Sequence, residues 1–169
     1  MDRVMPNGSG QLGVRQCGFT YIGLLLFIAM MGTALAGTGH LAISTLHANN
    51  SAETLDRIIN MFPQAQHAQI LMDLSQYLRA IISQRLVRTK DGRRVPAVEV
   101  MINTPHIAEL IKAGEIGSVK EAHADSTEPG MQTFDLSLYE LHKAGQIDIE
   151  TALINADSRA NLEAKINFG

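Results

Sequence analysis

The sequence has 169 residues but only one cysteine, no tryptophan and few aromatic side chains. A single cysteine excludes both an intramolecular disulfide framework and a zinc site built from four thiolates. Aromatic residues make up 5% of the chain, which argues against the stacking platforms that bind single-stranded nucleic acid. The formal net charge of −3 excludes a generally basic nucleic-acid binder, so we expect no nucleic-acid partner.

Charged side chains are missing from Gln16 to Ala52. Within this stretch, Phe19 to Ala36 read FTYIGLLLFIAMMGTALA. A helix of this length spans roughly 27 Å, close to the ~30 Å hydrocarbon core of a bilayer. The run therefore predicts a transmembrane-like helix over residues 19–36, preceded by a polar leader over residues 1–18. A buried core helix in a soluble protein is the alternative interpretation.

The residues that flank the apolar run indicate an orientation. Arg3 and Arg15 precede the run, and the next basic residue after it is Arg57. The positive-inside bias then places the N-terminus in the cytoplasm and the rest of the chain outside. A secretory signal stays an alternative, because TALA-G at residues 33–37 offers an A-x-A-like cleavage site.

A more specific pattern surrounds the start of the run. The string RQCGFTYIGLLLFIAMMG, residues 15–32, resembles the beginning of type IV prepilins and pseudopilins. The resemblance implies cleavage after Gly18 by prepilin peptidase and N-methylation of Phe19. That family usually has Glu five residues after the cut, where this chain has Gly23. The departure counts against assembly into a pilus more than against cleavage.

Residues 37–169 are predicted to form a compact and mostly helical body. The short apolar run Leu41–Leu46 predicts a buried strand. A capping box at Asn50 opens a helix through Asn60, and a second helix is expected from Gln64 to about Ser83.

The second half of the body begins with a predicted hairpin. Asp91-Gly92 is a hairpin turn signal between two β-rich runs, Arg85–Lys90 and Val95–Ile102. Helices are then expected from Thr104-Pro105 to Gly114, over Gln132–Ala144 and over Asp148–Asn155.

The residues alone support little chemistry. No G-x-x-x-x-G-K-[ST] motif occurs, and a P-loop needs its glycines and lysine to cradle phosphates. We therefore do not expect this chain alone to bind ATP well. His40 and His47 lie on either side of the predicted strand, seven residues apart, so a regular strand would point them to opposite faces. No metal site is predicted.

Collinear motifs run through the body from Thr38 to Phe168. They are TGHLAISTLHANN at residues 38–50, LDRIINMFP at 55–63, HIAELIKAGE at 106–115 and GMQTFDLSLYELHKAGQI at 130–147. Together they resemble the C-terminal part of type IV pilus retraction (twitching-motility) ATPases of the PilT/PilU type, with the later motifs closer to the PilU branch.

The resemblance implies a fold class and a site. The fold is an α/β fragment, the C-terminal portion of a RecA-like P-loop ATPase domain plus a helical tail, preceded by one N-terminal hydrophobic helix. Residues 38–50 match the family's His box, which reads the nucleotide's γ-phosphate. This role falls to His47 and secondarily to His40, and Thr45 with His47 forms a partial nucleotide-binding site. ATP and Mg are the family's cofactors, and we expect this chain alone to bind neither.

The resemblance also implies partners and a location. Walker A and Walker B precede the His box in the family and do not occur in residues 1–169. The chain is therefore expected to be inactive alone and at most a partner of intact retraction ATPase subunits, which form hexamers, and of the pilus inner-membrane platform. Residues 19–36 would hold it at the bacterial inner membrane, with residues 37–169 cytoplasmic, although the N-terminal charges predict the outside.

Two further hypotheses concern the whole chain. The change of character near residues 35–39 indicates a join, so the product of a mis-joined or remnant gene is one hypothesis. A membrane-anchored or secreted pseudopilin-like structural protein is the other.

Overall fold

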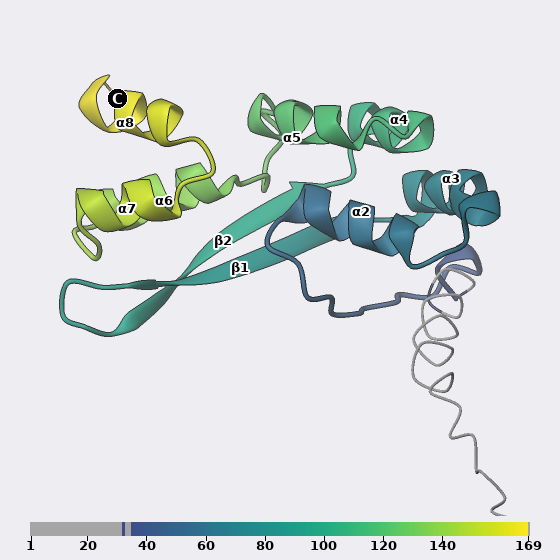
Figure 1. Cartoon of the computed structure of the whole chain (residues 1–169), viewed down its shortest axis with the longest axis horizontal. Coiled ribbons are helices and arrows are strands. Elements are labelled where there is room, and N and C mark those ends of the chain that lie inside the picture. Colours follow the sequence, from purple (N-terminus) through teal and green to yellow (C-terminus); the bar gives the residue numbers. More distant parts are fainter. Residues whose placement is uncertain (1–31, 33–34, 169) are drawn as a thin grey trace, which may run out of the picture.

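A computed structural model describes residue 32 and residues 35–168 (Figure 1). Its named elements are α2 Ser51–Asn60, η1 Gln64–Gln66, α3 His67–Tyr77, β1 Ala80–Arg88, β2 Arg94–Ile102, α4 Pro105–Ala113, α5 Ile116–Ala124, α6 Phe134–Lys143, α7 Ile149–Asn155 and α8 Arg159–Phe168. The predicted polar leader and most of the predicted apolar helix lie outside these residues. Within the described ranges, no helix combines the length and the apolar character needed to cross a membrane.

The predicted hairpin is confirmed and forms the sheet. β1 and β2 pair antiparallel, with Ala80 opposite Ile102 and Arg88 opposite Arg94. The turn uses Gly92 at φ 80°, a left-handed conformation that glycine adopts without a steric penalty. The Asp91-Gly92 signal therefore located the turn correctly, although β1 begins five residues before the predicted start.

Side chains alternate along both strands, and helices cover one face of the sheet. Odd-numbered residues point inward and are mostly buried, and α2, α6 and α7 contact the sheet. Two apolar clusters fill this side. One contains Leu55, Ile70, Leu74, Ile81, Met101, Ile107, Ile111 and Val119, and the other contains Val87, Ala97, Phe134, Leu138, Ile147 and Leu162.

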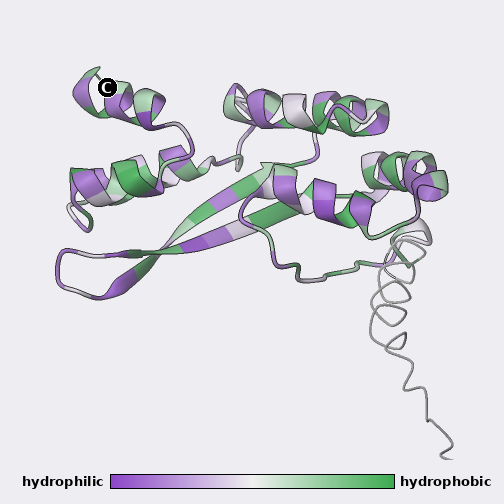
Figure 2. Cartoon of the chain, in the orientation of Figure 1, coloured by the Kyte–Doolittle hydropathy of each residue, from purple (hydrophilic) through white to green (hydrophobic). Residues whose placement is uncertain are grey.

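The other face of the sheet is exposed along β1, whereas Val98, Val100 and Ile102 of β2 are half-buried on it. Ile82 and Leu86 are 71% and 56% exposed, and Pro96 opposite Leu86 is also exposed. Figure 2 shows the apolar residues along both strands. The exposed apolar side chains of this face therefore lie mainly on β1, while the chain around Met131 and Gln132 adjoins the β2 half.

Polar caps determine where the helices begin, and the predicted caps at Asn50 and Thr104 are confirmed. The side chains of Asn50, Thr104, Thr133 and Asp148 each accept a hydrogen bond from a backbone N–H in the first turn of α2, α4, α6 and α7. These bonds satisfy donors that the helix itself leaves free. α4 ends at Gly114, whose φ of 77° is the usual left-handed helix stop.

Two predicted elements are wrong. Residues 41–46 form no strand, and Leu41 and Ile43 are 81% and 84% exposed. A strand needs a neighbouring strand for its backbone groups, and this run has none among the described residues. The second predicted helix ends at Tyr77 instead of Ser83, because the β-branched pair Ile81-Ile82 enters β1, with one side chain inward and one outward.

Two helices were not predicted as separate elements. α5 has no side-chain hydrogen bond at its N-cap, Glu115, so the usual start signal is missing. α8 lies in what was expected only as a helical tail, and it packs on α6 and α7 through buried Leu162. Both depend on tertiary contacts more than on local signals.

Candidate functional site

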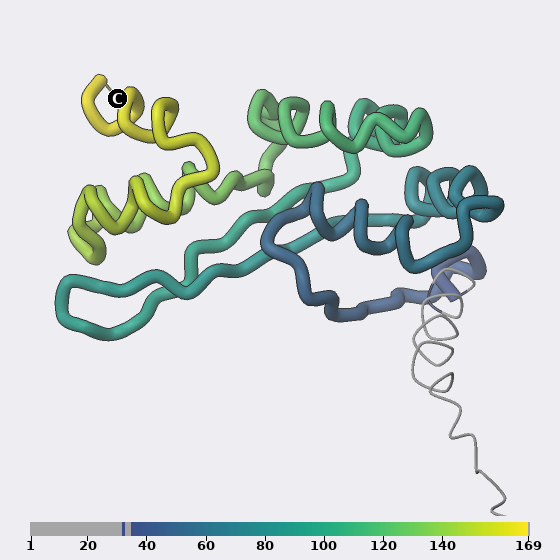
Figure 3. The backbone as a smooth tube through the Cα atoms, viewed as in Figure 1, coloured from purple at the N-terminus to yellow at the C-terminus, as the bar shows by residue number. Residues whose placement is uncertain are grey.

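The segment that resembles the His box is an exposed, irregular stretch between residue 37 and α2, visible in Figure 3. His40, Thr45 and His47 are all exposed on it. The hydroxyl of Thr38 donates to the carbonyl of Leu35 at 2.9 Å, and the same oxygen lies 3.0 Å from His40 Nδ1. Because the hydroxyl proton is already used, His40 Nδ1 is the donor in the second contact.

The end of this segment is held firmly to the body. The backbone N–H of Asn49 donates to Glu53 Oε2 at 2.9 Å, and its carbonyl accepts from Arg85 Nε and Nη2 at 3.3 Å. Asn50 Oδ1 accepts from the Glu53 N–H at 2.8 Å. His47 therefore lies two residues before backbone that is fixed from both sides.

A buried carboxylate anchors the next residue. Ser51 donates through its backbone N–H to Glu99 Oε2 at 2.7 Å and through its hydroxyl to Glu99 Oε1 at 3.1 Å. His123 Nδ1 lies 3.5 Å from the same Oε1, and its Nε2 contacts the carbonyl of Val100 at 3.0 Å. Glu99 thus joins α2, β2 and α5 at one point inside the body.

The charge of Glu99 is stabilised where it is buried. Burial raises the pKa of Glu99, but hydrogen bonds from His123, Ser83 and Ser51 lower it by more, so its pKa lies below the ordinary value of 4.5. Glu99 is consequently ionised at neutral pH. A carboxylate at the first turn of α2 also complements the helix dipole, which favours negative charge there.

Arg85 joins the hairpin to the C-terminal tail. Its guanidinium pairs with Asp157 at 2.7 Å, donates to the carbonyl of Asn155 at 3.1 Å and lies 3.9 Å from the ring centroid of Phe134. It is the same side chain that holds the carbonyl of Asn49. One inward side chain of β1 therefore couples the His-box segment to α6 and the loop before α8.

A second carboxylate shapes the loop between α7 and α8. Asp135 accepts from the N–H groups of Asp157 and Ser158 at 2.7 and 3.0 Å. Burial raises the pKa of Asp135 above its ordinary value, and these two bonds offset only part of that rise. The tail is thus fixed by ionic and backbone contacts as well as by apolar packing.

Sequence reasoning missed Glu99 and Arg85, although a signal was present. Val95, Ala97, Glu99 and Met101 are alternate residues of β2 and share its inward face. The pattern therefore places the Glu99 carboxylate inside the body. The inward position of Arg85 was not predicted, because the residues before it were expected to be helical. A correct start for β1 would have placed Arg85 on the inward face.

The predicted site residues are only partly brought together. His40, Thr45 and His47 share one exposed segment, and no side-chain hydrogen bond links Thr45 or His47 to another residue in the described ranges. Gly18 and Phe19, where processing is predicted, lie outside those ranges. No three His, Cys, Asp or Glu side chains in the described part of the chain gather as ligands for one metal ion.

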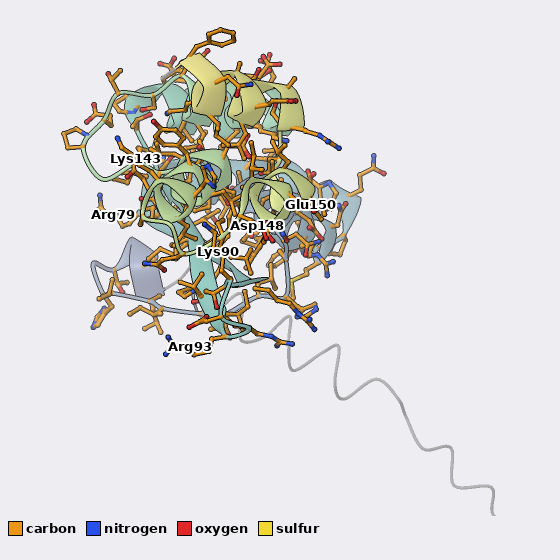
Figure 4. All side chains as sticks on the ribbon, turned by 90° about the vertical axis from the view of Figure 1, so that its left-hand side faces the viewer. Arg79, Lys90, Arg93, Lys143, Asp148 and Glu150 are labelled. Carbon is orange, nitrogen blue, oxygen red and sulfur yellow. The ribbon has the colours of Figure 1, made fainter. Side chains whose placement is uncertain are left out.

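The hairpin tip carries the basic residues Lys90, Arg93 and Arg94, and Arg93 is paired within the tip. Arg93 Nε donates to Asp91 Oδ2 at 2.7 Å. Hydrogen bonds from the Thr89 hydroxyl and from Arg93 lower the pKa of Asp91 to about 2. Figure 4 shows Lys90 and Arg93 at this end of the molecule, with Asp148 close to Lys90. Arg93 is therefore paired within the tip, and Lys90 and Arg94 leave the turn with net positive charge.

The described residues do not form a complete nucleotide site. Residues 38–50 contain imidazole, hydroxyl and amide groups but no Lys or Arg, and the nearby Arg85 is already paired with Asp157. Such donors fit one contact to a phosphate oxygen and do not fit the binding of a whole ATP–Mg complex. We derive no catalytic step from them.

Comparisons with known proteins agree with this partial architecture. Residues 28–109 match the family described as type II/IV secretion system protein. The chain is 50% identical over 80% of its length to the type IV pilus ATPase PilU of Pseudomonas aeruginosa, and 39% identical over 69% to PilT of the same organism. The crystal structure of the pilus retraction motor PilT with bound ADP matches 79% of this chain with a TM-score of 0.69 and 36% identity.

The match covers only part of each relative. The chain spans 36% of PilU, 34% of PilT and 37% of the crystallised PilT chain. The fold is thus a partial PilT-like ATPase fold, mostly helical with a small sheet. The chain belongs to the type II/IV secretion ATPase family and is homologous to about a third of its type IV pilus members PilT and PilU.

Proposed function

We propose that this chain acts in type IV pilus retraction as a partner of intact PilT/PilU-type ATPase subunits and does not hydrolyse ATP by itself. The observation that carries the proposal is the 50% identity with PilU over 80% of the chain, in a sequence that contains no P-loop motif. Because residues 37–169 are so similar to a motor subunit, we expect them to have surfaces that fit other subunits of such a motor. Without the glycine loop and its lysine, it has no cradle for the β- and γ-phosphates.

Within this proposal, His47 is the residue presented to a terminal phosphate, and His40 is secondary. The support is geometric. His47 is exposed, while the backbone just after it is fixed by Glu53, Arg85 and Glu99. Because the backbone two residues later is fixed, less of this segment needs ordering for His47 to meet a phosphate contributed by a neighbouring subunit.

Co-purification with an intact PilU-type ATPase tests the partnership directly. We expect the full chain to co-purify with that ATPase and to show no ATP hydrolysis above background when alone. His47→Ala should leave binding intact and change the ATPase rate of the mixed assembly, and the exposed Gln76→Ala on α3 is the matched control. Hydrolysis by the isolated chain, or no association with the ATPase, would contradict the proposal.

The N-terminal region belongs to the proposal as a membrane anchor. We propose that residues 19–36 hold the chain at the inner membrane and that residues 37–169 face the cytoplasm, where ATPase subunits reside. A reporter fused after Gly169 tests the topology, since alkaline phosphatase is active only outside and green fluorescent protein folds poorly when exported. An external C-terminus would favour the pseudopilin-like alternative.

The proposed join near residues 35–39 has its own test. Single long sequencing reads across codons 1–60 and the upstream kilobase should show one continuous reading frame if the chain is a genuine fusion. A broken frame, or an in-frame P-loop upstream of residues 38–50, would identify a longer retraction ATPase instead.

A further inference from the structure

One guanidinium contacts two parts of the chain that lie far apart in the sequence. Arg85 donates from Nε and Nη2 to the carbonyl of Asn49 at 3.3 Å, near the end of the His-box segment, residues 38–50. It also donates from Nη1 to the carbonyl of Asn155 at 3.1 Å, and its Nη2 pairs with Asp157 Oδ1 at 2.7 Å. Asn155 and Asp157 belong to the C-terminal tail, residues 149–168. Nη2 of Arg85 is therefore shared between the tail and the His-box segment.

The contacts to the tail determine how the guanidinium is oriented. Asp157 is an ionic partner at 2.7 Å, whereas the carbonyl of Asn49 is uncharged and lies farther away, at 3.3 Å. A short contact between opposite charges is the stronger of the two. The side chains of Arg85 and Asp157 are only 26% and 18% exposed, so water screens this pair less than a surface ion pair. Because the fork of an arginine is rigid, the tail fixes the direction of the N–H groups that reach Asn49.

Asp157 is itself held in place by α6. Its backbone N–H and that of Ser158 donate to the two carboxylate oxygens of Asp135 at 2.7 and 3.0 Å. Asp135 lies in the first turn of α6, which packs on β2 and α8. The ring of Phe134, the residue before it, lies 3.9 Å from the guanidinium of Arg85. The position of Asp157 is therefore set by the packed body.

At the His-box segment, Arg85 supplies the contact that the local turn cannot provide. The N–H of Asn49 is held by Glu53, four residues later, and Ser51 is held separately by Glu99. Within the described ranges, the carbonyl of Asn49 accepts from no group except Arg85. Loss of the Arg85 contact would consequently free the backbone before residue 50, while Glu99 still anchors α2. All of these contacts join residues between 49 and 158, so they do not depend on what precedes the His-box segment.

We propose that the C-terminal tail positions His47 through these contacts, with Asp157 orienting Arg85 and Arg85 holding the backbone two residues after His47. Asp157 is a positioning residue, because it acts on His47 only through Arg85. The coupling between the tail and the segment follows from contacts inside this chain, whereas the use of His47 toward a phosphate rests on the proposed function. A partner that draws residues 155–158 away from Arg85 would release the segment, so the tail is also a point of regulation.

Spin labelling measures this coupling in the full chain, dispersed in a non-ionic detergent. In a Cys17→Ser background, Leu46→Cys carries a nitroxide beside His47, and Lys112→Cys carries one at an exposed position of α4. Asp157→Asn preserves the size of the side chain and removes its charge. We expect the ratio of mobile to immobilised label at residue 46 to rise at least about threefold, and the label at residue 112 to stay unchanged.

Matched variants separate positioning from a general loss of stability. Glu163→Gln removes a charge from an exposed position of the same tail and should change neither label. Asp157→Glu retains the carboxylate and should restore most of the parent spectrum. In an Arg85→Gln chain, Asp157→Asn should add no further mobility, because its only route to the segment is already broken. Arg85→Lys retains the charge without the fork, and as the milder change it should also mobilise the label at residue 46.

A mixed assembly with an intact PilU-type ATPase provides the functional measurement. Asp157→Asn should change kcat for ATP hydrolysis in the same direction as His47→Ala, and it should add nothing to His47→Ala. The KM for ATP and the co-purification should be unchanged, because the intact subunits bind the nucleotide. A mobilised label with an unchanged kcat would support the positioning by the tail and contradict the phosphate role of His47.

Three outcomes would overturn the positioning itself, whatever the ATPase rate. They are an unchanged label at residue 46 in both Asp157→Asn and Arg85→Lys, equal mobilisation by Glu163→Gln, and additive effects of Asp157→Asn and Arg85→Gln.

Discussion

Removing the carboxylate of Glu99 should destabilise the body more than any other change of a polar side chain discussed above. Glu99→Ala leaves the N–H and hydroxyl of Ser51 and the ring of His123 without their shared acceptor. Each buried donor left without an acceptor costs about 1–3 kcal/mol, and Glu99→Ala leaves more than one such donor. Domains are stable by only about 5–15 kcal/mol, so this loss is a large fraction of the total.

A milder variant keeps the measurement possible if Glu99→Ala does not fold. Glu99→Gln retains the shape and one acceptor oxygen, but its amide NH2 faces a donor. We expect a loss of about 1–3 kcal/mol, the usual cost of one unsatisfied buried donor. The free energy of unfolding is measured by urea titration with circular dichroism. Glu109→Gln, on the exposed side of α4, is the control and should change it by less than about 0.5 kcal/mol.

The effect of Glu99 should depend on pH in a defined direction. Its pKa in the folded protein is depressed below the ordinary 4.5, so its stabilising contribution is fully present above that value. The contribution is lost as pH falls below about 4.5 and through the lowered pKa of the folded state. The difference in unfolding free energy between the parent and Glu99→Gln should therefore be constant at neutral pH and shrink in acid.

Two results would refute this reasoning. The first is a Glu99→Ala protein whose unfolding free energy equals that of the parent, and the second is a Glu99→Gln difference that grows as the pH is lowered. Hydrogen exchange at the Ser51 amide adds a local readout, since that N–H should exchange markedly faster once its acceptor is gone.

Three further changes have expected outcomes. Arg85→Lys should cost about 1–3 kcal/mol in urea unfolding, because an ammonium cannot reproduce the forked contacts to Asp157, Asn155 and Asn49, and an unchanged stability would contradict the role of Arg85. Gly114→Ala should cost about 1–2 kcal/mol, because alanine disfavours the left-handed φ of 77°, whereas Gly117→Ala inside α5 should not destabilise. If the prepilin resemblance holds, mass spectrometry of the chain expressed with prepilin peptidase should find a methylated N-terminal Phe19, and Gly18→Val should abolish that cleavage.

The sequence determined the local features of the body. The Asp91-Gly92 turn was predicted from residue types because it requires a φ that only a few residues tolerate. The starts of α2 and α4 were predicted because their caps, Asn50 and Thr104, are short side chains that bond within one turn. Collinear motifs in residues 38–168 also revealed the family, since they need no knowledge of packing.

Tertiary structure decided the features that depend on distant neighbours. Residues 41–46 have the composition of a buried strand, yet strand formation needs a partner backbone, and the described part of the chain supplies none. Ile81 and Ile82 fit either a helix face or a strand, and pairing with β2 settled the choice.

The candidate site shows the same division. His40, Thr45 and His47 were selected by motif, and they lie on an exposed stretch that forms no strand. The groups that anchor this segment come from 36 to 48 residues farther along the chain, at Arg85 and Glu99. A buried carboxylate is stable only where several donors converge on it. That convergence is a property of the folded body, which no local run of sequence specifies.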